Sequence, residues 1–306
     1  MLKKTAMILS ATAFAVSVGS AHASDSYSPV TSERLKDPEA SNWLHWRGNY
    51  EGWGYSPLDQ IDATNVADLE VAWTISSGVT EGHEAAPIVN DGMMFVTGAY
   101  NNLYALDATT GELLWHYKRQ LPEDVVTCCD VVNRGVAVHG DTVYMGTLDA
   151  HLLAFDAESG KIKWDITVEN YKDRYALTSA PVIIDDNIIV GVHGGEYGVR
   201  GFIAAYDVNS GEETWKTFTA IDDGSWPGDT YEHGGAPPWL SGTYDEETNT
   251  LFWGTGNPSP WIDPARGDDH DLHWSVSVVA LDPDTGELKD AYQYSPNDAW
   301  DYDGTN

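Results

Sequence analysis

The sequence has few cysteines and few basic residues. The first shortage argues against an attached haem, and the second argues against nucleic acids and anionic membranes as partners. Its only two cysteines, Cys128 and Cys129, are adjacent, so no Cys-x-x-Cys-His haem-attachment motif is present. Lys and Arg total 16 against 48 Asp and Glu, which gives a formal net charge of -32. Such a charge argues against nucleic acids and anionic membranes as partners. It suits an exported protein, including one that docks a basic protein.

Long hydrophobic runs are also scarce. One apolar stretch, residues 6–18, follows two lysines and precedes a small-residue cleavage sequence. This order is typical of a secretory signal, and the stretch is too short to span a membrane comfortably. We therefore expect residues 1–23 to be a signal peptide and the mature chain to begin at Ser24, with no membrane span. No Cys follows the cleavage site, so a lipid anchor is not expected.

The sequence is organised around a recurring phrase, in which Gly stands four positions after Asp and Trp stands four positions after Gly. Its copies are Asp107–Gly111–Trp115, Asp156–Gly160–Trp164, Asp207–Gly211–Trp215 and Asp282–Gly286, the last with Asp290 in place of Trp. Apolar runs precede each copy, and the Asp-to-Gly segment is typical of a turn. Hairpins that recur about every 50 residues predict the blades of a β-propeller. We expect an all-β propeller of about four blades, with the three Trp side chains packed between adjacent blades.

The rest of the chain divides around this repeat. Residues 24–65 are rich in Trp and Gly without clear periodicity, and we interpret them as an N-terminal lead-in segment. Asn65 to Trp73 is expected to be the entry to the first blade. Residues 66–306 are then a partial propeller, because no closing strand is recognisable near Trp300 to Asn306 and a propeller must hide its terminal strand edges. We expect the chain to be incomplete.

The adjacent cysteines allow two interpretations from the residues alone. In an exported protein they are expected to be oxidised where geometry allows. A disulfide between neighbours closes a small strained ring, which stabilises a fold very little by restricting the unfolded chain. Two reduced, buried thiols are the alternative.

Five motifs together give the chain a resemblance to the pyrroloquinoline quinone (PQQ) dependent alcohol dehydrogenases, which include methanol and ethanol dehydrogenases. The motifs are Gly82 to Pro87 (GHEAAP), Cys128 to Gly135 (CCDVVNRG), Gly194 to Gly201 (GGEYGVRG), Gly254 to Pro258 (GTGNP) and Trp300 to Asp303 (WDYD). The resemblance covers essentially the whole mature chain. It implies an eight-bladed propeller, of which this chain matches roughly the N-terminal half.

The resemblance also implies a set of cofactor contacts. The Cys128–Cys129 disulfide would lie against one face of PQQ and Trp239 against the other, while Arg134 would bind a cofactor carboxylate. The remaining contacts implied are Glu84 and Thr178 at the polar edge of the ring and the backbone of Gly194 and Gly195. His193 departs from the family, which usually has a small Ser before these two glycines.

A metal site is implied beside the cofactor. Glu196, Asn257 and Asp301 match the family's metal ligands, and Asp301 also matches the catalytic base. Asp303 lies two residues after Asp301, so in an extended strand both side chains would point to the same face. An additional carboxylate favours a trivalent lanthanide over calcium, since crowded carboxylates around a divalent ion repel one another.

The resemblance therefore predicts a periplasmic quinoprotein alcohol dehydrogenase. It would oxidise a small primary alcohol to an aldehyde and pass electrons to a periplasmic cytochrome c, and it is compatible with a homodimer. This chain alone would have little or no activity. Two alternatives use the same blades. One is a non-catalytic scaffold or binding protein, which would lack the adjacent cysteines and the ligand set. The other is a PQQ sugar dehydrogenase, against which the adjacent cysteines and the WDYD motif argue.

Overall fold

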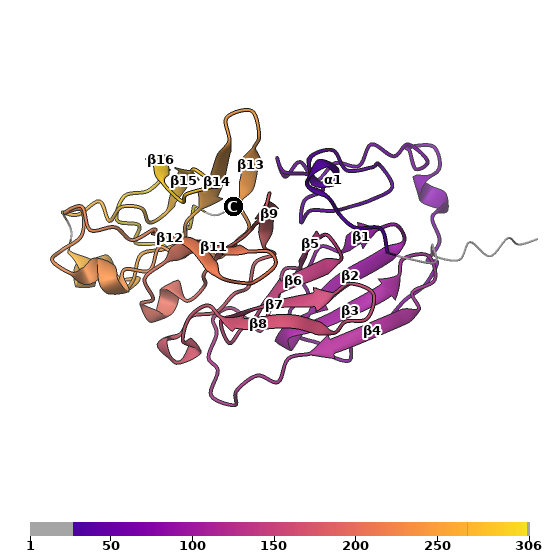
Figure 1. The fold of residues 1–306 in the computed structure, drawn as a ribbon. Coiled ribbons are helices and arrows are strands. Elements are labelled where there is room, and N and C mark those ends of the chain that lie inside the picture. Colours follow the sequence, from indigo (N-terminus) through magenta and orange to yellow (C-terminus); the bar gives the residue numbers. More distant parts are fainter. Residues whose placement is uncertain (1–26, 268, 305–306) are drawn as a thin grey trace, which may run out of the picture.

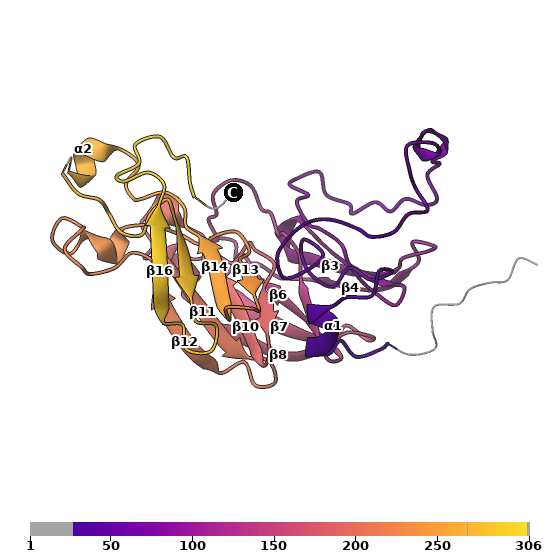
Figure 2. The same ribbon diagram turned by 90° about the horizontal axis from the view of Figure 1, so that it is seen from above.

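Four antiparallel sheets of four strands each make up the fold, which is seen in a computed structural model that describes residues 27–304 except residue 268. The predicted signal peptide, residues 1–23, lies outside the described residues. In every sheet the strands neighbour one another in chain order, as Figures 1 and 2 show. The prediction of an all-β propeller with about four blades is confirmed.

The strands of the four blades have similar lengths. They are β1 (Ile88–Asn90), β2 (Met93–Gly98), β3 (Asn102–Asp107) and β4 (Leu113–Lys118); β5 (Ala137–His139), β6 (Thr142–Gly146), β7 (His151–Asp156) and β8 (Ile162–Thr167); β9 (Val182–Ile184), β10 (Asn187–Gly191), β11 (Phe202–Asp207) and β12 (Glu213–Phe218); β13 (Thr243–Asp245), β14 (Thr250–Gly254), β15 (Ser277–Leu281) and β16 (Leu288–Gln293). The core lies between the sheets, and its largest fully buried side chains include Trp253, Phe95, Phe155 and Phe202.

Helical segments are short and lie in the connections. They are α1 (Ser32–Lys36), α2 (Asp263–Arg266) and the 3-10 turns η1 (Val66–Asp68), η2 (Ala99–Asn101), η3 (Tyr171–Asp173), η4 (Gly195–Tyr197) and η5 (Thr230–His233). In the described part of the chain, no helix has both the length and the hydrophobicity needed to cross a membrane.

The recurring phrase is the turn between the third and fourth strands of each blade. In the first copy, the Asp107 side chain accepts hydrogen bonds from the backbone N–H groups of Thr109 and Thr110, at 2.9 and 2.8 Å. Gly111 has a φ of +74°, which a residue with a Cβ adopts at a cost. Its N–H donates to the Asp107 carbonyl at 2.8 Å and closes the turn. The hydrogen bonds of the turn therefore join only residues within the phrase, which explains why the phrase could be recognised from the sequence.

The Trp of each phrase packs on the Gly of the next phrase. The Trp115 indole Nε1 donates to the Ala157 carbonyl at 2.8 Å, and a Cβ placed on Gly160 would lie 2.6 Å from the Trp115 ring. A Cβ placed on Gly211 would likewise lie 3.2 Å from the Trp164 ring, and one on Gly286 would lie 2.5 Å from the Trp215 ring. The predicted role of these three Trp side chains, packing between adjacent blades, is confirmed.

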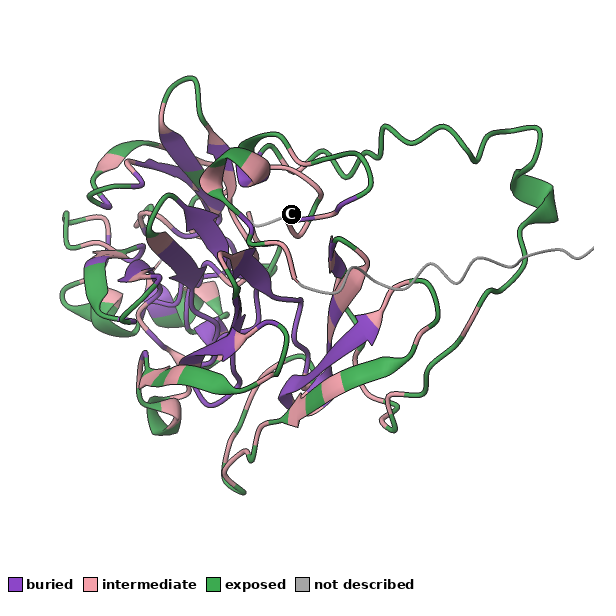
Figure 3. Cartoon of the chain, turned by 45° about the vertical axis from the view of Figure 1, so that its right-hand side comes forward, coloured by how far each residue is buried: buried purple, intermediate pink, exposed green. Residues whose placement is uncertain are grey.

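Trp73 repeats this contact at the start of the chain. Its Nε1 donates to the Ala108 carbonyl at 3.1 Å, and a Cβ on Gly111 would lie 2.6 Å from its ring. Trp73 therefore takes the position of the outer-strand Trp of a blade before β1–β4. Residues 69–77 are in no strand, and the sheet begins only at Ile88, so the segment from Asn65 to Trp73 leads toward the first described sheet without being one of its strands. Figure 3 shows the surrounding segment as a long exposed loop.

The inter-blade contact gives a stability prediction. We expect Gly160→Ala to lower the free energy of unfolding by about 2–4 kcal/mol, because the new methyl group meets the Trp115 ring and the backbone keeps a φ of +66°. Gly140→Ala is the matched control, since Gly140 has a φ of +57° and a Cβ placed on it would have no neighbour within 4 Å. It should cost about 1–2 kcal/mol, the backbone strain alone. Denaturant unfolding of both variants checks the difference, and equal losses would contradict the packing argument.

The lead-in segment runs along the inner strands of all four blades. Trp43 pairs with Val89 of β1, and Val30 pairs with Gly140 at the end of β5. Tyr50 bridges the other two blades: its hydroxyl donates to the Ile183 carbonyl at 2.9 Å, and its carbonyl accepts from the Tyr244 N–H at 3.0 Å. The segment thus ties together elements that are up to about two hundred residues apart in the chain.

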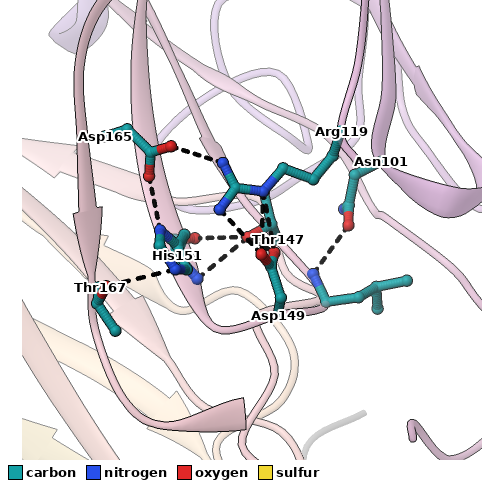
Figure 4. A network of polar contacts seen from close by, with 8 residues as sticks. Asn101, Arg119, Thr147, Asp149, His151, Asp165 and Thr167 are labelled. Atoms are coloured by element: carbon teal, nitrogen blue, oxygen red, sulfur yellow. Dashed lines mark hydrogen bonds and ion pairs between the residues drawn. The ribbon is translucent and has the colours of Figure 1, made fainter. Parts of the chain in front are cut away.

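A partly buried ion-pair network joins the first two blades (Figure 4). Arg119, directly after β4, binds Asp149 of the β6–β7 connection through Nε and Nη2, with a shortest distance of 2.9 Å. Its Nη1 lies 2.6 Å from Asp165 of β8, which also accepts from His151 at 2.6 Å. Burial raises the pKa of Asp165, but the hydrogen bonds from Arg119 and His151 together lower it by more, so the net pKa lies below its usual value.

We expect Arg119→Met to lower the free energy of unfolding by about 3 kcal/mol at pH 7, because it leaves buried Asp149 without its cation. The control Lys118→Met removes the same charge from the exposed neighbouring position and should have little effect. Arg119 also helps to lower the pKa of Asp165, and a carboxylate whose folded pKa is lowered contributes stability above its unfolded pKa of about 3.9 and loses it as the pH falls through the folded pKa. The difference between wild type and Arg119→Met should therefore narrow below about pH 4. A difference that stays constant from pH 7 to pH 3 would contradict this account.

Candidate functional site

All of the predicted site residues lie in two kinds of connection, which meet at one face of the blades. One kind leads into the inner strands β1, β5, β9 and β13 or follows β16, and the other joins the second strand of a blade to the third. Because successive strands are antiparallel, both kinds of connection emerge at the same face, and the Asp–Gly turns emerge at the opposite one. The first kind carries Glu84, Cys128, Cys129, Arg134, Thr178, Trp239, Asp301 and Asp303; the second carries Gly194, Gly195, Glu196 and Asn257.

Cys128 and Cys129 form a disulfide, so the interpretation as two reduced thiols is wrong and the pairing implied by the resemblance is confirmed. The neighbouring Asp130 accepts a hydrogen bond from the Gly82 N–H at 2.9 Å. A Cβ on Gly82 would lie 2.4 Å from Val132, so only glycine allows the segment before β1 to lie this close to the disulfide loop. The first and second blades thereby place the disulfide beside the segment that carries Glu84.

Arg134 connects the expected cofactor contacts of three blades. Its Nη2 lies 2.8 Å from Glu84 Oε2, its guanidinium carbon lies 4.7 Å from the centre of the Trp239 ring, and its backbone N–H donates to the Thr178 carbonyl at 2.9 Å. The Thr178 hydroxyl in turn donates to the Trp239 carbonyl at 3.3 Å. Burial lowers the pKa of Arg134, and the Glu84 carboxylate partly offsets this. Glu84, Arg134, Thr178 and Trp239 thus form one cluster, and their contact with a cofactor stays a prediction.

The predicted metal ligands lie next to this cluster: Asp303 contacts Asn257, and Glu196 and Asp301 lie near enough for their charges to affect the pKa of Asp303. Asp303 accepts hydrogen bonds from the Asn257 backbone N–H at 2.6 Å and from the Trp239 indole Nε1 at 3.0 Å. Burial raises the pKa of Asp303 to about 6, and the charges of Asp301 and Glu196 act in the same direction. Burial likewise raises the pKa of Glu196, with a further contribution from Asp301. Carboxylates whose pKa is raised by burial and by neighbouring negative charge bind a cation favourably, because the cation offsets both effects.

The backbone around Asp301 and Asp303 differs from the sequence prediction. Both residues have left-handed conformations, with φ of +60° and +59°, and no strand follows β16 in the described residues. The prediction that an extended strand would point both side chains to one face is therefore wrong. The physical reason is a local turn, in which Asp298 accepts hydrogen bonds from the N–H groups of Trp300 and Tyr302. Asp303 is partly buried and Asp301 is exposed, and the charge of Asp301 contributes to raising the pKa of Asp303.

Buried Arg266 of α2 holds the beginning of this turn. Its Nη2 donates to the Asp298 carbonyl at 2.6 Å and to Asn297 Oδ1 at 3.0 Å. At the other end of the turn, the Gly304 N–H donates to the Thr255 carbonyl at 2.9 Å. The loop that carries the two Asp side chains is thus fixed at both ends.

Gly194 and Gly195 are required by packing within the protein. A Cβ on Gly194 would lie 2.3 Å from the Arg174 carbonyl oxygen, and one on Gly195 would lie 2.6 Å from Pro237 and 3.1 Å from Asn257 Oδ1. Glycine here lets the β10–β11 connection lie against the next blade, beside a predicted metal ligand. A close approach of this backbone to a cofactor stays a prediction.

Several buried polar atoms of the site have no hydrogen-bond partner in the described residues: Arg134 Nη1, both ring nitrogens of His193 and Glu196 Oε2. Such atoms are rare in folded proteins and are usually explained by an ion, a water molecule or a ligand. The guanidinium of Arg134 and the ring nitrogens of His193 suit an anionic planar molecule. The carboxylate of Glu196 suits a hard cation beside it. The residues present therefore fit PQQ and a metal ion.

A second interpretation of part of this group is a soft-metal site. The Cys128 sulfur, a His193 nitrogen and a Glu196 oxygen all lie within 4.8 Å of one another. The Cys128 sulfur is part of the disulfide, however, and only a thiolate binds a metal such as zinc. The disulfide therefore excludes this site in the oxidised protein.

Comparison with known proteins adds a family and several relatives. Residues 43–306 match the family model described as "PQQ: Glucose/ethanol/alcohol dehydrogenase, beta-propeller domain". The chain is 41% identical to the quinoprotein alcohol dehydrogenase PedH of Pseudomonas putida over 94% of this chain and 51% of the relative. It is 39% identical to a quinoprotein ethanol dehydrogenase of Pseudomonas aeruginosa over 96% of this chain and 54% of the relative. The chain thus spans about half the length of the curated relatives it matches.

Solved structures give the same result. A quinohemoprotein alcohol dehydrogenase, ADHIIG of Pseudomonas putida, is 38% identical with a TM-score of 0.86, covering 91% of this chain and 44% of the other. A structure described as a europium-containing methanol dehydrogenase is 36% identical with a TM-score of 0.85, covering 90% of this chain and 52% of the other. The likeness extends over the blades that carry the candidate site.

Proposed function

Because this chain belongs to the family of PQQ-dependent alcohol dehydrogenases, we propose that it oxidises a small primary alcohol to an aldehyde as part of a periplasmic quinoprotein. The observation that carries the proposal is the meeting at one face of the disulfide, the Arg134 cluster and the acidic group of Glu196, Asp301 and Asp303. A scaffold built from the same blades has no need of neighbouring carboxylates whose pKa is raised by burial and by nearby negative charge. The acidic group therefore favours an enzyme over a binding protein.

The residues of the chain have distinct roles in this proposal. When bound, PQQ would supply the two-electron acceptor, and the cation would supply Lewis acidity at the quinone carbonyl. Arg134 would bind a carboxylate of the cofactor, while the disulfide and Trp239 would exclude water from its two faces. Glu196, Asn257, Asp301 and Asp303 would hold the cation. Asp301 would also take the hydroxyl proton of the alcohol, since it is the more exposed of the two Asp side chains.

We further propose that a lanthanide is preferred over calcium at this site. Three carboxylates suit a trivalent ion better than a divalent one, because more of their mutual repulsion is neutralised. The relative described as a europium-containing methanol dehydrogenase is consistent with this preference.

The electron acceptor is proposed to be a cytochrome c with a basic docking face. The net charge of -32 supports such a partner, because complementary charge speeds the encounter of two proteins. Export by a cleaved signal peptide, predicted from residues 1–23, would place the protein in the same compartment.

A dye-linked alcohol oxidation assay on the full-length protein tests the proposed function. The protein would be reconstituted with PQQ and either lanthanum or calcium, with ethanol and glucose as substrates. Ethanol oxidation that needs PQQ and is faster with lanthanum is the expected result. Faster oxidation of glucose would favour a sugar dehydrogenase, and no oxidation by folded protein with either metal would favour a scaffold. Residues 24–306 alone are not expected to turn over, because they correspond to only about half the length of the curated relatives.

A further inference from the structure

His193 is a buried side chain whose hydrogen-bonding groups are unused. It lies between β10 and η4 and is 5% exposed. Its backbone is fixed by a two-way pairing with Ala176, in which the His193 N–H donates at 2.8 Å and its carbonyl accepts at 3.3 Å. Neither Nδ1 nor Nε2 of the ring has a partner in the described residues. Burial of an imidazole in this way costs free energy unless another group completes its hydrogen bonds.

The surroundings of His193 indicate what that group is. Its Nε2 lies 3.9 Å from Glu196 Oε2, which is too far for a hydrogen bond, and the Cys128 sulfur lies within 4.8 Å of both. In either protonation state the imidazole has at least one N–H donor, because a neutral ring has one and a charged ring has two. The imidazole thus lies where the disulfide, Arg134 and Glu196 meet. These three groups are the expected contacts of the cofactor and its metal.

We propose that His193 is a cofactor-recognition residue, whose ring N–H donates a hydrogen bond to an oxygen of bound PQQ. The inference rests on the proposed function and extends it to a residue at which this chain departs from the resembling family. A direct role as a metal ligand is the competing explanation. It is disfavoured because hard cations such as calcium and lanthanides prefer oxygen to the nitrogen of imidazole.

Calorimetric titration of PQQ into the full-length apoprotein, at saturating lanthanum, tests the inference. His193→Leu removes both ring nitrogens and should raise the Kd for PQQ by about tenfold or more, since a buried partner loses its hydrogen bond. His193→Asn keeps a donor and should stay closer to wild type. His139→Leu is the control, because His139 ends β5 at the opposite face and should leave the Kd unchanged. Thermal unfolding confirms that each variant is folded.

Terbium luminescence, measured without PQQ, separates the competing roles. The proposal predicts that His193→Leu binds terbium within about threefold of wild type, because the oxygen ligands are intact. A wild-type Kd for PQQ in His193→Leu would overturn the inference, as would a loss confined to terbium binding, which would show that His193 acts through Glu196. If the wild-type protein binds terbium but no PQQ, the proposed function itself fails.

Discussion

Replacing Asp301 by Asn is expected to lower kcat for alcohol oxidation by about a thousandfold, while the Kd for PQQ changes by less than about threefold. The amide keeps an oxygen that can face the cation but cannot accept the hydroxyl proton, and a general base typically contributes about 10²–10⁴ in rate. Asp301 is suited to this role because it is exposed at the site face, whereas Asp303 uses both carboxylate oxygens to accept hydrogen bonds.

Steady-state kinetics at saturating PQQ and lanthanum give the required comparison. Asp290→Asn is the matched control, because Asp290 is exposed on β16 in the place of the phrase Trp and contacts none of the predicted ligands. The control should keep nearly full activity. If Asp301→Asn keeps more than about a tenth of the wild-type kcat, Asp301 is not the base, and if it loses PQQ binding as well, its role is structural.

Replacing Asp303 has the second large expected effect, on the choice of metal. Asp303→Asn should weaken lanthanum binding by about a hundredfold and calcium binding by about tenfold or less. Loss of one negative charge weakens the attraction of a trivalent ion more than that of a divalent one. Asn is preferred to Ala because Asp303 also accepts hydrogen bonds from Trp239 and Asn257, and the amide oxygen keeps one of them. Competition of lanthanum and calcium against terbium luminescence measures both affinities. Equal losses for the two ions, or none, would show that Asp303 is not a ligand.

Much of the fold could be predicted because the features of its repeat depend on contacts between residues that are close in the sequence. Asp107 accepts hydrogen bonds from residues two and three positions later, Gly111 adopts a positive φ, and Trp115 lies four residues further on. Each of these features depends on neighbours in sequence, so one phrase could be recognised in four places. The candidate site was predicted for a different reason, from motifs that resemble those of a known family, and the structure places these motifs just before inner strands or between second and third strands.

The features that could not be predicted depend on distant residues. The left-handed backbone of Asp301 and Asp303 follows from Asp298, itself held by Arg266 more than thirty residues earlier. The unsatisfied imidazole of His193 can be recognised only once Cys128 and Glu196 are seen around it. Nothing in the sequence pattern indicated that Tyr50 would bridge two blades. In each case the local sequence permits several conformations, and contacts from elsewhere in the fold select one.

Diffraction from crystals of the full-length protein grown with PQQ and lanthanum, measured near a lanthanum absorption edge, tests the central claim most directly. We predict one strong anomalous peak at about 2.3–2.6 Å from carboxylate oxygens of Glu196, Asp301 and Asp303, as expected for a large hard cation. The quinone should lie beside this peak, between the Cys128–Cys129 disulfide and Trp239. A peak elsewhere, with no density for the quinone at this face, would contradict the account.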